Sequence, residues 1–307
     1  MNPFRIEGPA RISFSGGRTS AYMLRRIIDA HGGRLPEDVH VVFANTGKER
    51  PETLDFIQEC ATRWDVRVRW IESWIYVVFQ RFAGVDASGN VLTTPERSFS
   101  VREVSYDTAS RDGEPFETLI RASRYLPNPV MRKCTGKLKV EAINAFARDH
   151  LRLDEWTSVV GLRADEPRRV AKMRAQERPE SGGEIGVELP LADARVTIGE
   201  VMAFWAAQPF DLRLRPDEGN CDLCFLKGLA KISRIMRAHP ELADWWIRME
   251  RIAEQEGWKR PGHPGDGRFR HDRPSYVKQL KIVQSTPLLP GIDLDGEDDG
   301  LPCACTD

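Results

Sequence analysis

The chain of 307 residues is long enough to bury a large core, in one domain or in one domain with a smaller appendage. Its 45 basic and 46 acidic side chains nearly cancel, which excludes the strong overall positive charge typical of many nucleic-acid-binding proteins. No apolar run approaches the roughly 20 residues that cross a membrane, and the first residues lack an apolar secretory segment. We therefore expect a cytoplasmic protein with no membrane partner.

The first predicted elements are a strand, a tight turn and a helix. An apolar run around Ile12 ends at Ser15, and apolar side chains then recur at helical spacing from Met23 to Ile28. Between them lies the run Ser15-Gly16-Gly17-Arg18-Thr19-Ser20. Glycines allow close backbone approach to a ligand, and the N–H groups at a helix start attract negative charge. The run predicts a phosphate loop, with an ordinary glycine turn and a serine cap as the alternative.

Alternating strands and helices follow with short connections. The pattern predicts a strand from Val39 to Ala44, a helix from Pro51 to Trp64 and a strand from Val66 to Ile71. Such alternation indicates an α/β fold built on a doubly wound parallel sheet. Ligands of these sheets bind at the carboxyl ends of the strands, where Ser15-Gly16-Gly17 and Asn45-Thr46-Gly47 both lie.

Periodicity fades between Gly84 and Pro129, where Gly, Ser, Thr, Arg and Asp accumulate. We expect residues 84–129 to form an inserted, partly ordered lid or substrate loop. Its arginines could contact phosphates, although solvated surface positions are favoured for most of them: Arg97, Arg102, Arg111, Arg121 and Arg124.

Three further features are predicted between residues 132 and 200. An amphipathic helix continues from residues 132–141 to about His150, and a buried strand from Trp156 to Val160 ends in a charged loop. Thr197 with Glu200 has the spacing of a capping box, which is a structural role at a helix start.

Four stretches resemble the adenine nucleotide α-hydrolase superfamily, which contains the PP-loop ATP pyrophosphatases and the PAPS and APS reductases. Residues 15–20 are similar to its SGGxxS pyrophosphate loop, and residues 43–56 resemble its "DTG…PETLxF" stretch, with Asn in place of the usual Asp. Residues 156–169 resemble its "GxRxxES…R" stretch. Cys134-Thr135 before a Leu-Lys pair resembles the DNA-phosphorothioation sulfurtransferases more closely than the reductases. The resemblance covers about residues 11 to 225.

This resemblance implies a Rossmann-like sheet that binds ATP and Mg²⁺ at the carboxyl ends of its strands. Catalytic roles would fall to Ser15, Lys137 and Arg163. The implied nucleotide-binding residues are Ser15, Gly16, Gly17, Arg18, Thr19, Ser20, Asn45, Thr46, Gly47, Gly161, Arg163 and Arg169.

Three regions are expected along the chain. Residues 1–210 would form the PP-loop nucleotide-binding α/β domain, residues 211–290 a smaller, mostly helical region, and residues 291–307 a flexible acidic tail. Cys60 lies in the middle of a predicted helix, where we expect a buried core thiol.

The cysteines favour metal or redox chemistry, because six in a chain of this size do not resemble a secreted disulfide framework. Cys221 and Cys224 have the spacing by which one turn presents two thiolates to a metal. By resemblance to the reductases, these two and Cys134 would hold a [4Fe–4S] cluster. Cys305, Cys303 or a non-protein ligand would take the fourth position, or one iron would stay open. A structural zinc site is the alternative.

Together these features predict an ATP pyrophosphatase that forms AMP and pyrophosphate and couples an adenylated intermediate to sulfur transfer through the cluster. The sulfur acceptor would be a nucleic acid or a small molecule, and the reductant a thioredoxin-like or ferredoxin-like protein. One alternative is an APS or PAPS reductase, an oxidoreductase with a C-terminal cysteine as nucleophile. A second is a non-catalytic nucleotide-binding or DNA-binding subunit. The motifs predict no oligomeric state.

Overall fold

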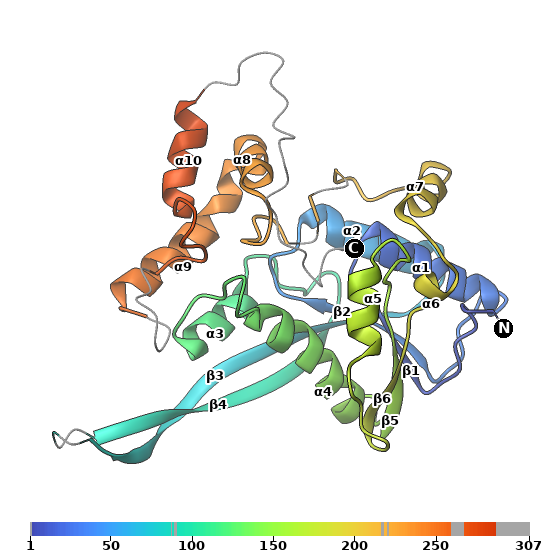
Figure 1. Ribbon diagram of the computed structural model, residues 1–307, viewed down its shortest axis with the longest axis horizontal. Helices are drawn as coiled ribbons and strands as arrows, with labels where there is room; N and C mark the ends of the chain where they lie inside the picture. Colours follow the sequence, from blue (N-terminus) through green and yellow to red (C-terminus); the bar gives the residue numbers. More distant parts are fainter. Residues whose placement is uncertain are drawn as a thin grey trace.

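A mostly parallel sheet forms the centre of the protein (Figure 1). The computed structural model describes residues 2–86, 88, 91–215, 218–219, 221–258 and 267–286. Within them six strands form one sheet in the order β4-β3-β2-β1-β5-β6, parallel at every pairing except β3 with β4. The strands are β1 Ala10–Ser13, β2 Val39–Asn45, β3 Val68–Val85, β4 Val91–Val104, β5 Glu155–Val159 and β6 Gly183–Glu188. The expected α/β class is confirmed, and the sheet is mostly parallel, with β4 antiparallel at one edge.

Helices pack against both faces of this sheet. They are α1 Arg18–Ala30, α2 Pro51–Arg63, α3 Glu114–Ser123, η1 Cys134–Glu141, α4 Ala142–Asp149, α5 Pro167–Arg174, α6 Pro190–Asp193, α7 Ile198–Ala206, α8 Leu229–Ala238, η2 Pro240–Leu242, α9 Ala243–Gln255 and α10 Tyr276–Ser285. Alternate residues of β2 face opposite sides, as the two-residue period of a strand requires. Val41 and Phe43 belong to the cluster that contains α1, α2 and α7, whereas Val42 and Ala44 pack with α4.

Several predicted boundaries agree with the structure. The predicted strand from Val39 is β2, and the predicted helix from Pro51 is α2, which ends one residue earlier than expected. Cys60 is completely buried in the cluster beneath α2, so the expected core thiol is confirmed. The capping box is also confirmed, because the Glu200 carboxylate accepts a hydrogen bond from the Thr197 N–H at 2.8 Å.

The segment expected to be a loop is largely regular structure. The strand predicted to end at Ile71 continues as β3 to Val85, turns, and returns as β4 in an antiparallel pair that extends far from the body (Figure 1). Helix α3 follows. The prediction of an inserted loop was therefore wrong for most of residues 84–129. A ribbon exposed on both faces lacks the alternation of apolar and polar side chains by which strands are recognised.

The charged loop expected after Gly161 also contains a helix. Pro167 occupies the first turn of α5, a position that suits proline because its missing N–H has no helical partner. No residue of α5 is buried. The helix predicted near residues 132–150 is present, but its first part, η1, has π-helical hydrogen bonding and passes directly into α4.

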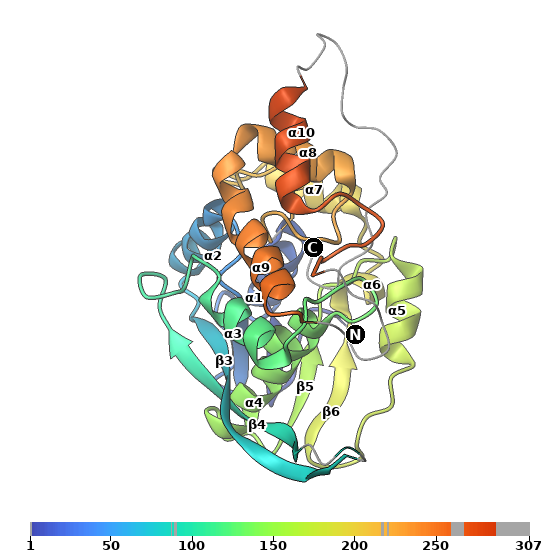
Figure 2. The same cartoon turned by 90° about the vertical axis from the view of Figure 1, so that its left-hand side faces the viewer.

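Helices α8, α9 and α10 gather above α3 (Figure 2). Their apolar side chains form a second cluster with α3, which includes Phe116, Trp246 and Phe269. None of the described helices combines the length and apolar character of a membrane-spanning segment. The predicted acidic tail, with Cys303 and Cys305, lies outside the described residues.

Candidate functional site

The loop between β1 and α1 is closed by its own serine hydroxyls. Ser20 Oγ donates to the Gly17 carbonyl at 3.0 Å and accepts from the Ser15 hydroxyl at 2.9 Å. Gly16 has a φ of +80°, and a Cβ there would lie 2.7 Å from side-chain carbons of Thr53 and Ile57. Gly17 precedes α1 and places no side-chain acceptor on the first N–H groups of that helix. The loop therefore presents backbone donors at the carboxyl end of β1.

The loop after β2 is held by bonds within the protein. Asn45 Nδ2 donates to the Glu72 carboxylate at 2.7 Å, and the Thr46 hydroxyl donates to Glu49 at 2.9 Å. Gly47 has a φ of +77°, and a Cβ there would lie 3.0 Å from the backbone of Gly113. Asn45 and Thr46 are therefore buried residues that hold this loop in place. Neither lines the cavity beside the β1–α1 loop.

The end of β5 meets the start of α1. A Cβ on Gly161 would lie 3.5 Å from the Cα of Ser20, an ordinary van der Waals distance, so the two segments lie side by side. Arg163 donates to the Thr19 hydroxyl at 3.0 Å and to the Asp165 carboxylate at 2.9 Å. The structure therefore brings Gly161, Thr19 and Arg163 together beside the β1–α1 loop, as the sequence predicts.

A cavity of about 810 Å³ opens on the α4 and α5 side of the sheet, beside the β1–α1 loop. This volume lies within the range of small-molecule sites, about 300–1,000 Å³. Ser15 and Ala44 line it from the ends of β1 and β2, and Val160 from the residue after β5. Its basic lining side chains come from both flanking helical segments and from the floor: Arg11, Arg132, Lys139, Arg168, Arg169 and Lys172. The cavity therefore suits an anionic ligand with an apolar portion.

Two predicted site residues point elsewhere. The Arg18 guanidinium donates to the Asp211 carboxylate at 2.8 Å and to the Leu212 carbonyl, so it anchors the segment after α7. Lys137 pairs with Glu141 one helical turn along and does not line the cavity. The nearby cavity-lining lysine is Lys139, whose Nζ lies 3.4 Å from Glu49.

The floor of the cavity contains a charged group that the sequence prediction missed. Arg11 in β1 is 4% exposed and donates to the Ser158 hydroxyl at 2.5 Å and to the Glu184 carboxylate at 2.7 Å. Among the described residues its Nε has no hydrogen-bond partner. Burial lowers the pKa of Arg11, and Glu184 opposes that change. The only sequence signal was an arginine inside a short apolar strand.

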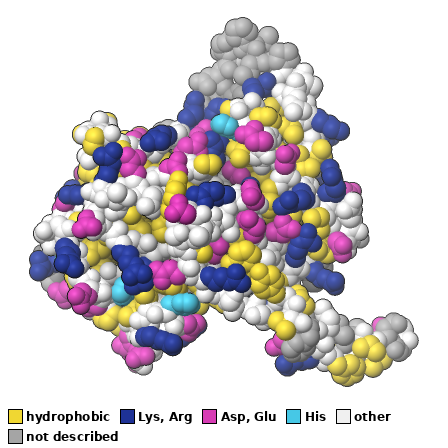
Figure 3. Space-filling view, turned by 180° about the vertical axis from the view of Figure 1, so that it is seen from behind, with side chains coloured by type: hydrophobic (Ala, Val, Ile, Leu, Met, Phe, Trp, Pro, Cys, Tyr) yellow, Lys and Arg dark blue, Asp and Glu magenta, His cyan; other side chains and the backbone are white. Residues whose placement is uncertain are grey.

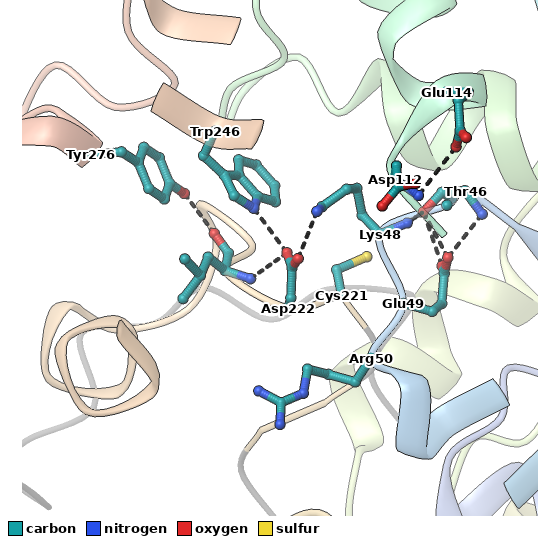
Figure 4. A network of polar contacts seen from close by, with 12 residues as sticks. Thr46, Lys48, Glu49, Arg50, Asp112, Glu114, Cys221, Asp222, Trp246 and Tyr276 are labelled. Carbon is teal, nitrogen blue, oxygen red and sulfur yellow. Dashed lines mark hydrogen bonds and ion pairs between the residues drawn. The ribbon is translucent and has the colours of Figure 1, made fainter. Parts of the chain in front are cut away.

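The Cys221–Cys224 turn is fastened to the loop after β2 (Figure 4). Asp222, between the cysteines, accepts from Lys48 Nζ and from the Trp246 indole N–H, each at 2.8 Å. The Asp222 N–H in turn donates to the Lys48 carbonyl at 2.9 Å. The side chains of Lys48 and Asp222 are 6% and 3% exposed. The cysteine turn and the edge of the sheet are therefore one continuous buried structure.

The surroundings of the cysteines bear on the expected metal. Cys134 and Cys224 both pack against the apolar cluster under α9. Buried Lys227 donates to the Cys221 carbonyl at 2.7 Å. Burial lowers the pKa of Lys227, and the neighbouring Cys224 and Cys221 oppose that change, so the Lys227 amine lies near both thiols.

Among the described residues no three His, Cys, Asp or Glu side chains gather closely enough to hold a metal ion. Cys305, an expected ligand, lies outside those residues. The described donors fit a metal centre in part. Cys221 and Cys224 lie on one turn held by Asp222, and Cys134 packs against the same apolar cluster as Cys224.

Comparison with known proteins adds one relationship. No family model matches the chain. The chain is 30% identical over 223 residues to the uncharacterized nin region protein ORF290 of Escherichia phage lambda, and the match spans 72% of this chain and 67% of the phage protein. The chain therefore belongs to the same family as the lambda nin region protein ORF290.

Proposed function

We propose that the protein cleaves ATP between its α- and β-phosphates and uses the adenylated intermediate in sulfur transfer. The observation that carries this proposal is the position of the Ser15–Ser20 loop beside a cavity with six basic lining side chains. A nucleoside would lie against the apolar wall, with its phosphates toward the loop. The proposal also assigns the sheet to the doubly wound, adenine nucleotide α-hydrolase-like fold.

The chain's own groups would stabilise the leaving pyrophosphate. Backbone N–H groups at the start of α1 face the developing negative charge without needing to reorganise, which is the usual source of large electrostatic stabilisation. Arg163 is held beside Thr19 on that loop, and Arg169 and Lys139 line the cavity from opposite sides. Lys139 takes the role that the sequence assigned to Lys137. Bound Mg²⁺ would supply further positive charge at the phosphates.

The floor of the cavity would orient the apolar end of the ligand. Buried Arg11 and Ser158, with the partly exposed Glu184, offer both hydrogen-bond donors and acceptors. A ligand group mismatched to the two buried side chains would stay unsatisfied. A heteroaromatic base carries both kinds of group at its edge. The floor therefore supports a nucleotide as ligand better than a simple polyphosphate.

The sulfur part of the proposal rests on the cysteine turn. Cys221, Cys224 and Cys134 would hold an iron–sulfur cluster, with zinc as the alternative metal, and such a cluster would supply the sulfur or electron chemistry. Asp222 and Lys48 would keep the two cysteines of the turn at the carboxyl edge of the sheet, near the cavity.

Calorimetric titration with Mg²⁺–ATP and with PAPS tests the nucleotide. ATP is expected to bind, and Gly17→Val is expected to abolish binding because its side chain enters the phosphate position. Arg25→Ala, on the exposed side of α1, is the matched control and should bind normally. In the presence of the acceptor, AMP and pyrophosphate should appear. Formation of ADP, or binding of PAPS without ATP, would refute the proposal and favour the reductase.

A further inference from the structure

The β3–β4 ribbon forms an arm that extends beyond the sheet. Strand β2 pairs with β3 only from Val68 to Glu72 among the described pairings, so residues 73–85 pair with β4 alone. We define the arm as residues 73–85 and 91–101. An isolated two-stranded ribbon is only marginally stable in water, and its open edges are templates for pairing. Contact with another surface would therefore stabilise the arm and cover its open edges.

The arm also carries an unusual share of exposed apolar surface. Of the 12 large hydrophobic side chains exposed among the described residues, six belong to it: Tyr76, Val77, Val78, Phe82, Val85 and Val91. Phe82 is 65% exposed and Val91 is 64% exposed. Figure 3 shows apolar side chains on the arm where it leaves the body. A concentration of exposed apolar side chains on one element favours a binding role for that element.

A second apolar feature lies at the base of the same arm. A groove of about 360 Å³ runs between β3, α3 and the segment after α9. Ile75, Ala122 and Trp258 line it, and its charged lining side chains are Arg121, Arg124 and Glu256. Arg121 also pairs with Glu117 at 2.7 Å, whereas Arg124 follows the end of α3. The turn at the arm tip carries the opposite charge, because it contains Asp86, whose carboxylate accepts a hydrogen bond from the Ser88 N–H. The chain therefore carries both an apolar tip with an acid and a groove in which basic side chains outnumber the acidic one.

We infer that the arm pairs with the arm of a second copy of this chain in a closed, two-fold symmetric dimer. Tyr76 at the groove and Val85 at the tip are about 30 Å apart along an extended strand. Two arms lying antiparallel would therefore place each tip at the groove of the other. Phe82 and Val85 would enter the partner groove, and Asp86 would face Arg121 and Arg124. Because both contacts are identical, the assembly closes at two copies.

The arm's charges favour a protein partner over a nucleic acid. Arg81 forms an ion pair with Glu96 at 3.1 Å, and Arg97 donates to the Ala122 carbonyl, so both arginines are used within the chain. Phosphate binding requires an excess of basic groups along the contact surface. The inference is independent of the proposed nucleotide chemistry, since the groove at the base of the arm and the cavity share no lining residue.

Sedimentation of the full chain over a range of concentrations tests the dimer. Phe82→Glu is expected to raise the dimer dissociation constant by at least about 30-fold, as loss of a central aromatic contact does. Ile282→Glu, a similar change at an exposed residue of α10, should leave the constant unchanged. Circular dichroism and the thermal midpoint should match the parent chain for both variants. A monomer at all concentrations, or a dimer indifferent to Phe82→Glu, overturns the inference.

Two further experiments locate the contact. Asp86→Arg should weaken the dimer, and combining it with Arg124→Asp should restore it; Asp suits position 124, where φ is +55°. Mixing Val85→Cys protein with Tyr76→Cys protein under oxidising conditions should yield a disulfide between residues 85 and 76 of different copies. Absence of that crosslink from a dimer, or loss of DNA binding without any change in oligomeric state in Phe82→Glu protein, would also overturn it.

Discussion

Lys48 Nζ lies 2.8 Å from a carboxylate oxygen of Asp222, and both side chains are almost wholly excluded from solvent. Lys48 follows the second strand of the sheet, and Asp222 stands between two cysteines more than 170 residues later. The Lys48 amine also lies 5.2 Å from the Trp245 ring centre. This ion pair is a buried polar link between the loop after β2 and the cysteine turn, and it can be tested directly.

Breaking that pair should be costly. Asp222→Asn or Lys48→Met removes one charge and leaves the other buried, which typically costs about 3–5 kcal/mol of unfolding free energy. Arg25→Ala is the control, because its pair with Asp29 is exposed and such pairs contribute about 0–1 kcal/mol. Urea denaturation followed by tryptophan fluorescence measures both. If Asp222→Asn or Lys48→Met lowered the unfolding free energy no more than Arg25→Ala does, the role assigned to the buried pair would be contradicted.

The two glycines of the first loop should behave differently. Gly16→Ala forces a side chain into left-handed backbone and against Thr53 and Ile57, so it should lower the thermal midpoint. Gly17 has a φ of −92°, which alanine adopts readily, so Gly17→Ala should fold normally and weaken Mg²⁺–ATP binding. Thermal melts and calorimetry separate the two effects. A stable Gly16→Ala protein would argue against the loop geometry.

The metal hypothesis predicts a visible spectrum. Anaerobically purified protein should absorb broadly at the blue edge of the visible range, and Cys134→Ala, Cys221→Ala and Cys224→Ala should each remove that absorption. Cys60→Ala should retain it, because Cys60 is a core thiol whose pKa is raised well above its usual value by burial. Iron and sulfide analysis accompanies the spectra. One equivalent of zinc without iron would rule out the cluster.

The C-terminal cysteines distinguish the two enzymatic alternatives. If sulfur transfer occurs at Cys134, Cys221 and Cys224, truncation before Cys303 should preserve much of the activity, unless a tail cysteine is the fourth ligand. A reductase would need a tail thiolate, and truncation would then abolish turnover while nucleotide binding persisted. Mass spectrometry after incubation with APS or PAPS provides the decisive measurement. A sulfonate adduct that requires the tail would favour the reductase.

Local sequence patterns predicted the elements whose burial or end residues leave a distinct signal in the sequence. Strand β2 is an apolar run because both its faces are buried, and α2 begins at Pro51, so both were predicted nearly to the residue. The arm was missed because its strands are exposed and its pairing depends on backbone hydrogen bonds. Helix α5 was missed because none of its residues is buried, so it has no apolar stripe.

Proximity among candidate site residues was predicted where they follow neighbouring strand ends, and their roles stay predictions. The Ser15–Ser20 run and Arg163 do lie together, since each follows a strand end at one edge of the sheet. Arg11 with Glu184, and Lys48 with Asp222, pair residues from distant elements, and sequence spacing carries no information about such contacts. Arg18 fits the motif in sequence, yet its side chain turns toward Asp211 because a carboxylate is available there.

Helix α5 contributes basic side chains to the cavity but buries no residue of its own. Little apolar surface would be exposed if it moved away from the sheet, so its attachment is weak in free-energy terms. Arg169 pairs with Glu166, while Arg168 and Lys172 add further positive charge to the same wall, which a bound anion would offset. The negative charge of a bound ligand would then hold α5 against the sheet. Helix α5 would be well ordered when the cavity is occupied and more mobile when it is empty.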